Sequence, residues 1–243
     1  MTTNSFDDER CQSISENLKL IRENIATAAV KSGRNYEDIK LMAVTKTVPV
    51  EYINYSIDNC GVNLIGENKV QEFLFKKDSL HLDNVEKHLI GHLQTNKVKK
   101  IVPLVDMIQS VDSLHLAEEI SKQAINNNIN CNILLEVNIG SEESKTGFDK
   151  TAFFESLSKI SELPNLTVKG IMTIPPICDN ENEQKKYFMT MSEYFEAIKE
   201  KKYKNFDMQI LSMGMSGDYE MAIECGANLV RIGSLIYGAR IYK

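Results

Sequence analysis

Short apolar segments alternate with helical patterns along most of the chain. One such segment, "KLMAVTK", begins near residue 40, and similar segments follow it as "NLIGEN", "KHLIGH", "MIQSVD", "NILLEVN", "TVKGIMT", "MQILSMG" and "LVRIGSLIYG". Strands that are apolar on both faces are typical of parallel strands covered by helices. The pattern therefore predicts about eight strand–helix units.

The segments between the predicted strands carry helix signals. Near the N-terminus, Ser13 and Glu16 have the spacing of a capping box, an apolar stripe follows them, and Gly33 can end the helix. Pro49 suits a first helical turn and Gly61 suits a helix end. The segments "SLHLAEEISKQAINNN" and "TAFFESLSKISEL" are further helix candidates. We therefore expect one helix ahead of the first strand and helices between the strands.

This order of elements predicts an α/β fold, a single (β/α)₈ TIM barrel with an extra N-terminal helix. Such barrels have about 250 residues, and the chain has 243. We expect one domain over residues 1–243, with the extra helix in 1–35 and the barrel in 36–243. Binding and catalytic groups of this fold gather where the strands end and the βα loops begin. Polar residues at those positions are therefore the candidates for a site.

Composition and charge narrow the range of functions. The formal net charge is −6, which does not favour broad binding to nucleic acid or to an anionic membrane. The five cysteines are far apart and form no CxxC pair, as expected in a reducing compartment. The N-terminal "MTTNSFDDER" is too polar for a signal peptide, and no apolar run reaches the roughly 20 residues that cross a bilayer. We expect a cytoplasmic protein.

Lys46 ends the first predicted strand, where an unpaired ammonium group would be costly to bury. One interpretation is a lysine that extends its amine to solvent. The other is a nucleophilic amine that forms a Schiff base, with its pKa lowered by an apolar environment. Barrels that use such a lysine are aldolases or proteins that hold pyridoxal 5′-phosphate (PLP). The choice depends on whether a phosphate site lies opposite.

Two segments near the C-terminus suit a phosphate group. "LSMGMSGDYEMAIECGA" follows the seventh predicted strand, and "VRIGSLIYGAR" contains the eighth. Their glycines let the backbone approach an anion closely, and the loops after strands seven and eight are the usual phosphate site of this barrel. The alternative is an ordinary turn with methionines in the core. Combined with Lys46, the two segments favour PLP over a sugar-phosphate aldolase. The residues concerned are Ser212, Gly214, Ser216, Gly217, Gly233 and Ser234.

Three other polar residues near strand ends have more than one interpretation. His88 and His92 are four residues apart, but they lie on a predicted strand and no third ligand is evident, so we expect no metal site. Glu67 follows the second strand and either pairs with a cation at the barrel mouth or has a structural role.

The motifs "AVTKTVP", "IGENKVQE", "HLIGHLQTNK", "QSVDS", "LLEVNIGSEESKTGF", "GIMTIPP", "LSMGMSGDYEMAI" and "VRIGSLIYGAR" occur in this order. Together they resemble the motifs of the YggS/PROSC family, the PLP homeostasis (PLP-binding) proteins. The resemblance extends from about residue 40 to the C-terminus. It implies a fold like the N-terminal barrel of alanine racemase, with PLP held as an internal aldimine.

The resemblance also implies roles for individual residues. Lys46 matches the Schiff-base lysine, Asn68 the asparagine beside the cofactor, and Arg231 the arginine that faces the pyridine nitrogen. Lys145 matches a loop lysine proposed to help PLP enter and leave. The implied cofactor-binding set is Lys46, Asn68, Ser212, Met213, Gly214, Arg231, Gly233 and Ser234.

The chemistry of Arg231 favours a carrier over an enzyme. PLP accepts electrons best when its pyridine nitrogen is protonated, whereas a permanently cationic arginine can only donate to that nitrogen. A racemase also needs a second base, which alanine racemase takes from an added domain that this chain is too short to contain. We expect a monomer or weak dimer that delivers PLP to apo-enzymes. Two alternatives remain, a weak PLP-dependent amino-acid racemase and a PLP-independent aldolase.

Overall fold

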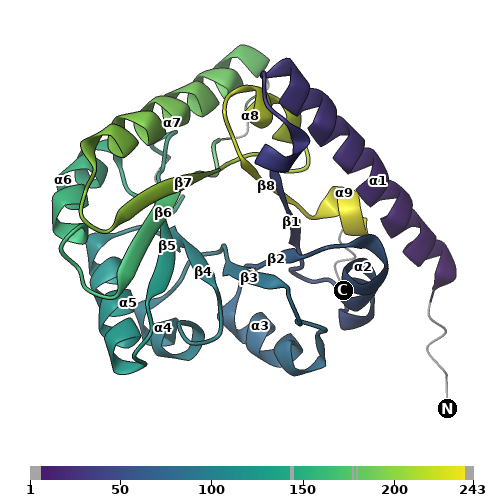
Figure 1. Ribbon diagram of the computed structural model, residues 1–243, viewed down its shortest axis with the longest axis horizontal. Coiled ribbons are helices and arrows are strands. Elements are labelled where there is room, and N and C mark those ends of the chain that lie inside the picture. Colours follow the sequence, from purple (N-terminus) through teal and green to yellow (C-terminus); the bar gives the residue numbers. More distant parts are fainter. Residues whose placement is uncertain (1–6, 143–144, 177, 179, 239–243) are drawn as a thin grey trace.

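The computed structural model describes residues 7–142, 145–176, 178 and 180–238. Within these residues, eight parallel strands close into a barrel in chain order, and the last strand pairs with the first (Figure 1). The predicted (β/α)₈ fold is therefore confirmed. The strands are β1 (Lys40–Val44), β2 (Leu64–Glu67), β3 (Glu86–Leu89), β4 (Met107–Val111), β5 (Cys131–Glu136), β6 (Leu166–Met172), β7 (Phe206–Ser212) and β8 (Leu229–Ile232).

Helices surround the barrel (Figure 1). They are α1 (Asp8–Lys31), α2 (Val50–Cys60), α3 (Val70–Lys76), α4 (Thr95–Ile101), α5 (Leu114–Asn126), α6 (Lys150–Ile160), α7 (Glu181–Lys201), α8 (Tyr219–Glu224) and α9 (Ser234–Tyr237), with short 3₁₀ turns η1 (Tyr36–Asp38) and η2 (Lys77–Ser79). None of these helices combines the length and the apolar composition needed to cross a bilayer, as far as the described residues go.

The extra N-terminal helix is present, but it begins earlier than the sequence pattern predicts. Asp7 caps α1, accepting a hydrogen bond from the Arg10 backbone N–H at 3.3 Å. Ser13 lies inside the helix, where its hydroxyl donates to the Glu9 carbonyl oxygen at 2.9 Å. An aspartate cap followed by an acidic first turn suits the positive end of the helix dipole, so this start is favoured over Ser13.

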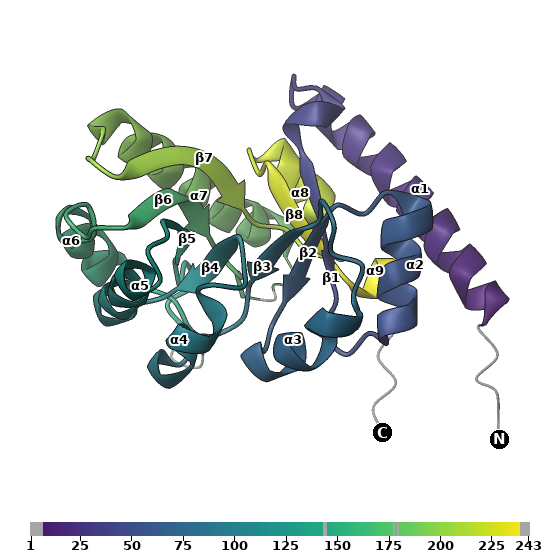
Figure 2. The same cartoon turned by 60° about the horizontal axis from the view of Figure 1, so that its bottom comes forward.

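The α1 helix packs on the outside of the barrel beside α2, α8 and α9 (Figures 1 and 2). Its predicted end at Gly33 is close to the observed one, because α1 ends at Lys31 and Gly33 has φ 73°. The end of α2 is as predicted, with Gly61 in the left-handed conformation at φ 66°. Such a conformation is accessible to glycine without a steric penalty.

Two apolar layers hold the barrel together. The larger layer lies between strands and helices, where apolar faces of both elements are buried. The smaller layer fills the barrel interior, as expected for a fold whose strands alternate inward and outward side chains. Its members are Met42, Val44, Leu64, Ile90, Met107, Leu134, Met172, Ile210 and Leu229. Polar groups above this interior layer lie at the carboxyl ends of the strands.

A candidate ligand-binding cavity at the mouth of the barrel

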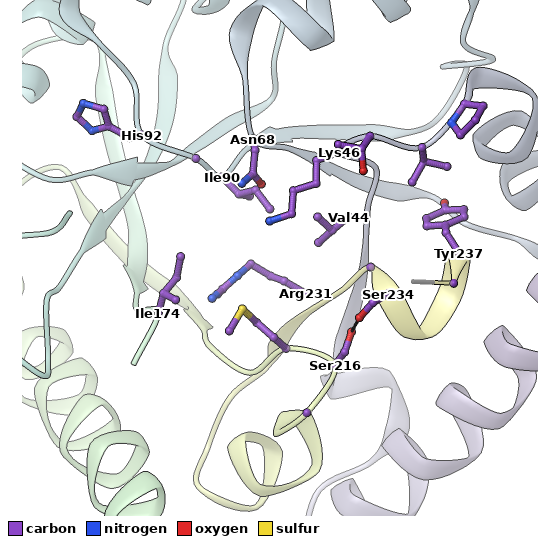
Figure 3. Close-up of a pocket in the computed structure, with 18 of the residues that line it drawn as sticks. Val44, Lys46, Asn68, Ile90, His92, Ile174, Ser216, Arg231, Ser234 and Tyr237 are labelled. Carbon is purple, nitrogen blue, oxygen red and sulfur yellow. Dashed lines mark hydrogen bonds between the residues drawn. The ribbon is translucent and has the colours of Figure 1, made fainter. Parts of the chain in front are cut away.

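A cavity of about 660 Å³ lies at the carboxyl ends of the strands, a volume typical of small-molecule sites. Five residues of the cofactor-binding set that the resemblance implies line it, namely Lys46, Asn68, Arg231, Gly233 and Ser234. They come from the ends of β1, β2 and β8, which the barrel brings together although they lie far apart in the sequence (Figure 3).

Lys46 extends into this cavity from the end of β1. Figure 3 shows its amine directed toward Arg231, with Asn68 beside it and the apolar side chains of Val44 and Ile90 close by. The residue is half-buried. Lys46 therefore lines the cavity, where a ligand can reach its amine.

Arg231 lies on the opposite side of the cavity and is 4% exposed. Its Nη1 donates to the Ser212 hydroxyl at 2.7 Å, and its Nη2 donates to the Thr173 carbonyl oxygen at 2.8 Å. Burial lowers the pKa of Arg231 to about 10, an effect opposed by the carboxyl groups of Glu136 and Asp218. Arg231 is therefore still a cation at neutral pH, fixed in position and able only to donate hydrogen bonds.

A chain of hydrogen bonds continues from Arg231 through the barrel interior. The Ser212 hydroxyl donates to Gln109 Oε1 at 2.7 Å, and Gln109 Nε2 lies 2.8 Å from His88 Nδ1. His88 Nε2 lies 2.8 Å from Glu86 Oε1, and this hydrogen bond is the main reason that the pKa of Glu86 falls to about 2. Because the Gln109 amide nitrogen can only donate, His88 Nδ1 accepts its hydrogen bond, and His88 Nε2–H donates a hydrogen bond to the Glu86 carboxylate.

Only some residues of the predicted phosphate site line the cavity. The Ser212 hydroxyl is fully buried behind Arg231, and Met213 is fully buried in the apolar core. A Cβ at Gly214 would lie 2.6 Å from the Ala222 side chain, so Gly214 allows close packing against α8. The reason is that β7 extends as far as Ser212, and the chain reaches the cavity only afterwards. The residues of this segment that line the cavity are Met215, Ser216 and Gly217.

Hydroxyl and backbone groups from two loops meet at this part of the cavity wall, which we call the β7–β8 cradle (residues 215–217 with 233 and 234). Ser216 Oγ and Ser234 Oγ lie 3.0 Å apart (Figure 3), and the Leu235 N–H donates to Ser216 Oγ at 3.4 Å. A Cβ at Gly233 would lie 3.2 Å from the Val44 carbonyl oxygen, which is a tight approach. The cradle therefore presents two hydroxyls on a close-packed backbone.

Asp218 fixes the turn that forms one side of the cradle. Its Oδ1 accepts from the Met215 N–H at 2.6 Å, and its Oδ2 accepts from Gln184 Nε2 at 2.7 Å. Burial raises the pKa of Asp218, although both hydrogen bonds act in the opposite direction. The carboxyl group is thus held by the turn and by α7.

Arg10 is a lining residue that the sequence pattern does not reveal. It comes from the first turns of α1, stacks with its guanidinium carbon 4.0 Å from the centre of the Tyr52 ring, and donates to the Tyr237 carbonyl oxygen at 3.4 Å. Only the packing of α1 against α2 and α9 brings this cation to the mouth. No local motif around Arg10 signals it.

Glu136, at the end of β5, also lines the cavity and was not predicted. It is 3% exposed, and its Oε1 accepts from the Thr146 hydroxyl at 2.8 Å. Its Oε2 is buried and has no hydrogen-bond partner among the described residues. Burial is the main cause that raises its pKa, Asp112 adds to the effect, and Arg231 opposes it. A buried polar atom without a partner indicates that a ligand group can bind there.

We predict that Glu136→Gln stabilises the protein at alkaline pH. Folding raises the pKa of Glu136, so the folded state binds the proton of this carboxyl group more tightly than the unfolded state does. The contribution of Glu136 to the free energy of unfolding therefore falls as the pH rises from the pKa of the unfolded state through the pKa of the folded state. Glutamine keeps the shape without ionising. The Tm of the variant should exceed that of the wild type at about pH 8, where about 1 kcal/mol corresponds to roughly 2–4 °C. The difference should shrink near about pH 4.5; an equal gain at both pH values would contradict the prediction.

Two other candidate residues lie at or outside the rim. Lys145 is exposed on the loop between β5 and α6 and is not part of the cavity lining, and two of its neighbours, 143–144, lie outside the described residues. His92 lines the cavity and its Nδ1 lies 2.9 Å from Asp112 Oδ2. No three His, Cys, Asp or Glu side chains come together as a metal site within the described part of the chain.

The cavity thus combines an amine, a fixed guanidinium, a hydroxyl-lined cradle and a partly unsatisfied carboxyl group. Two basic groups and the cradle suit an anionic ligand that also carries a hydrogen-bond acceptor. The amine suits a carbonyl group. These residues fit a phosphorylated aldehyde such as PLP, the cofactor expected from the sequence.

Comparison with known proteins agrees with the fold and with the family expected from the sequence. Residues 17–241 match the family model described as alanine racemase, N-terminal domain. A "Pyridoxal phosphate homeostasis protein" of Aquifex aeolicus is 44% identical over 227 residues, covering 93% of this chain and 98% of the relative.

Solved structures are similar over nearly the whole chain. An unknown protein from Bifidobacterium adolescentis has a TM-score of 0.91 and 35% identity, over 97% of this chain and 98% of its own. PipY of Synechococcus elongatus, solved with PLP bound, has a TM-score of 0.81 and 29% identity, over 93% of this chain and 100% of its own. The chain therefore belongs to the family of the alanine racemase N-terminal domain and, within it, to the pyridoxal phosphate homeostasis proteins.

Proposed function

We propose that the protein binds PLP in this cavity, holds it through a covalent bond to Lys46, and delivers it to apo-enzymes as part of cytoplasmic PLP homeostasis. The observation that carries the proposal is the Lys46 amine directed into the cavity that also contains Arg231 and the β7–β8 cradle (Figure 3). The PLP bound to PipY and the name of the Aquifex relative support the same ligand.

Each part of the cavity suits one part of PLP. The Ser216 and Ser234 hydroxyls would bind the phosphate group, and the Arg231 guanidinium would donate to the pyridine nitrogen. The Lys46 nitrogen would bond to the aldehyde carbon while the aldehyde oxygen leaves as water, with Asn68 adjacent. Bound PLP supplies an electron-accepting ring, but a donor such as Arg231 keeps the ring nitrogen unprotonated, which favours storage over carbanion chemistry.

The proposal is tested by binding and transfer. Protein freed of cofactor should take up one PLP per chain, with a new absorbance band near the edge of the visible range. Loaded protein should then activate a PLP-dependent apo-enzyme in the presence of a scavenger that removes free PLP. Failure to bind PLP would overturn the proposal. D-alanine formation that scales with protein concentration and is lost with Lys46→Ala would instead support the alternative, a weak racemase.

We predict that the double variant Ser216→Ala/Ser234→Ala binds PLP about tenfold more weakly or worse. A hydrogen bond to a charged group contributes about 1.5–3 kcal/mol, and the variant removes two hydroxyls from the cradle. Titration followed by absorbance measures the loss. Pyridoxal, which lacks the phosphate group, is the matched control, and its affinity should be unchanged. An equal loss for both ligands would show that the cradle does not bind the phosphate group.

Lys145 is the candidate for a role in transfer, since it is exposed on the loop that also contains Thr146, a residue that lines the cavity. We predict that Lys145→Ala leaves the absorbance band intact and slows PLP transfer to the apo-enzyme. Lys204→Ala is the control, because Lys204 is an exposed lysine that pairs with Glu162 at 3.6 Å. Equal transfer rates for the two variants would remove the proposed role.

A further inference from the structure

A buried ion cluster lies directly behind the chain segment that contains Lys46. Lys76 Nζ, from α3, lies 3.3 Å from Glu67 Oε2 and 2.6 Å from Glu72 Oε1. The exposed fractions of the three side chains are 8% for Lys76, 3% for Glu67 and 21% for Glu72. Buried ion pairs are weak sources of stability, because desolvation offsets most of their attraction. A cluster of this kind therefore calls for an explanation other than stability.

The cluster holds the backbone on both sides of Lys46. Lys76 Nζ donates to the Thr45 carbonyl oxygen at 2.9 Å, one residue before Lys46. Glu72 Oε1 accepts from the Thr47 N–H at 2.5 Å, one residue after it. In addition, the Thr45 hydroxyl donates to Glu67 Oε2 at 3.1 Å. Lys46 is thus the residue between two backbone anchors.

One of these anchored residues has an unfavourable backbone conformation. Thr47 has φ 63°, which is rare for a β-branched residue and costs about 1–3 kcal/mol. Its N–H is the group that Glu72 accepts from, so the cluster stabilises this conformation. The turn at Thr47 ends the extended chain of β1 and leaves the Lys46 side chain at the mouth of the barrel.

The same cluster also contacts the residue beside the amine. Glu67 Oε1 accepts from the Asn68 N–H at 3.0 Å, and Asn68 lies next to Lys46 in the cavity (Figure 3). Neither Lys76 nor the two carboxyl groups of the cluster line the cavity. The hydrogen bonds from the cluster reach the cavity through the backbone of Thr45, Thr47 and Asn68.

We infer that Glu67, Lys76 and Glu72 are positioning residues that fix the Lys46 amine for covalent capture of the aldehyde. The inference rests on the proposed function, in which Lys46 bonds to PLP. A displacement of about 1 Å at a reacting group can reduce its reactivity about a hundredfold, so anchoring on both sides of Lys46 has a direct chemical consequence. If the cluster had only a structural role, its removal would lower the Tm and would change the affinity for every ligand of the cavity by the same factor.

The test compares two ligands in one variant. Glu67→Gln/Lys76→Met removes one positive and one negative charge together, and the carboxylate that loses its partner is that of Glu72, which is 21% exposed. We expect its affinity for PLP to fall about tenfold or more. Its affinity for 4-deoxypyridoxine 5′-phosphate, which has the same ring and phosphate but no aldehyde, should change less than about twofold.

Two further variants keep the test decisive. Lys169→Met is the matched control, because Lys169 pairs with Asp207 at 2.7 Å near the beginning of β7, away from the mouth, and both affinities should stay at the wild-type values. Thr47→Gly removes the backbone strain and leaves the three side chains of the ion cluster in place, and it should keep or raise the Tm. Because the Thr47 side chain also lines the cavity, both ligands lose its contacts, and a flexible backbone beside Lys46 should weaken the binding of PLP more than that of the deoxy analogue. Thr47→Gly also decides the matter if the double variant fails to fold.

The inference is overturned if the Glu67→Gln/Lys76→Met variant loses affinity for PLP and for the deoxy analogue by the same factor, or if neither affinity changes. The failure of the proposed function looks different. In that case the wild-type protein itself would bind the analogue as tightly as PLP and would form no covalent bond to the aldehyde.

Discussion

Lys46→Ala should abolish the absorbance band of bound PLP and weaken PLP binding by about a hundredfold or more, equivalent to about 2.7 kcal/mol. The reason is geometric, because Lys46 directs its amine into the cavity (Figure 3), and alanine has no group that can bond to an aldehyde. The fold should be retained, since the half-buried Lys46 side chain belongs to neither apolar layer of the barrel.

Lys69→Ala provides the control for this result. Lys69 is an exposed lysine that directly follows Asn68, and it is not among the residues that line the cavity. Its loss should leave the band and the affinity at the wild-type values. A persistent band in Lys46→Ala, or an equal loss in both variants, would mean that another group holds the aldehyde.

Arg231→Met should be the most destabilising change in the site, with a loss of about 3–5 kcal/mol in the free energy of unfolding. The change leaves the buried carboxyl groups of Glu136 and Asp218 without their counter-charge. It also leaves the Ser212 hydroxyl oxygen and the Thr173 carbonyl oxygen without a donor. For a chain of this size the loss corresponds to a fall in Tm of roughly 6–20 °C.

The cause of this loss can be separated from simple cavity formation. Adding Glu136→Gln to Arg231→Met neutralises one of the two carboxyl groups and should restore part of the Tm. Arg231→Lys should not keep the wild-type Tm, because lysine cannot reproduce the two hydrogen bonds that the guanidinium makes in different directions. Thermal denaturation followed by circular dichroism measures these effects. A Tm of Arg231→Met within about 2 °C of the wild type would contradict the assigned role of the buried cation.

Much of the fold could be predicted because parallel strands covered by helices produce a repeating apolar pattern. Once the strand ends are known, the barrel topology alone brings Lys46, Asn68 and Arg231 to one mouth, even though they are spread over most of the chain. Gly233 and Ser234 could be predicted in the same way, because they directly follow the end of β8.

The remaining features depend on where an element ends and on tertiary contacts. Ser212 and Ser216 both belong to "LSMGMSGD", and only the observed end of β7 decides that Ser212 lies behind Arg231 while Ser216 lines the cavity. Arg10 reaches the mouth because α1 packs against elements distant in sequence. The sequence alone allows two interpretations of Glu67, and only the position of α3 shows that Lys76 pairs with it.

The most direct test of the central claim is to trap the bond between protein and ligand. Protein saturated with PLP is reduced with borohydride, digested, and examined by mass spectrometry. We expect one reduced pyridoxyl phosphate group per chain, on the peptide that contains Lys46. A label on a different lysine, or the absence of any label from protein that demonstrably binds PLP, would contradict this expectation.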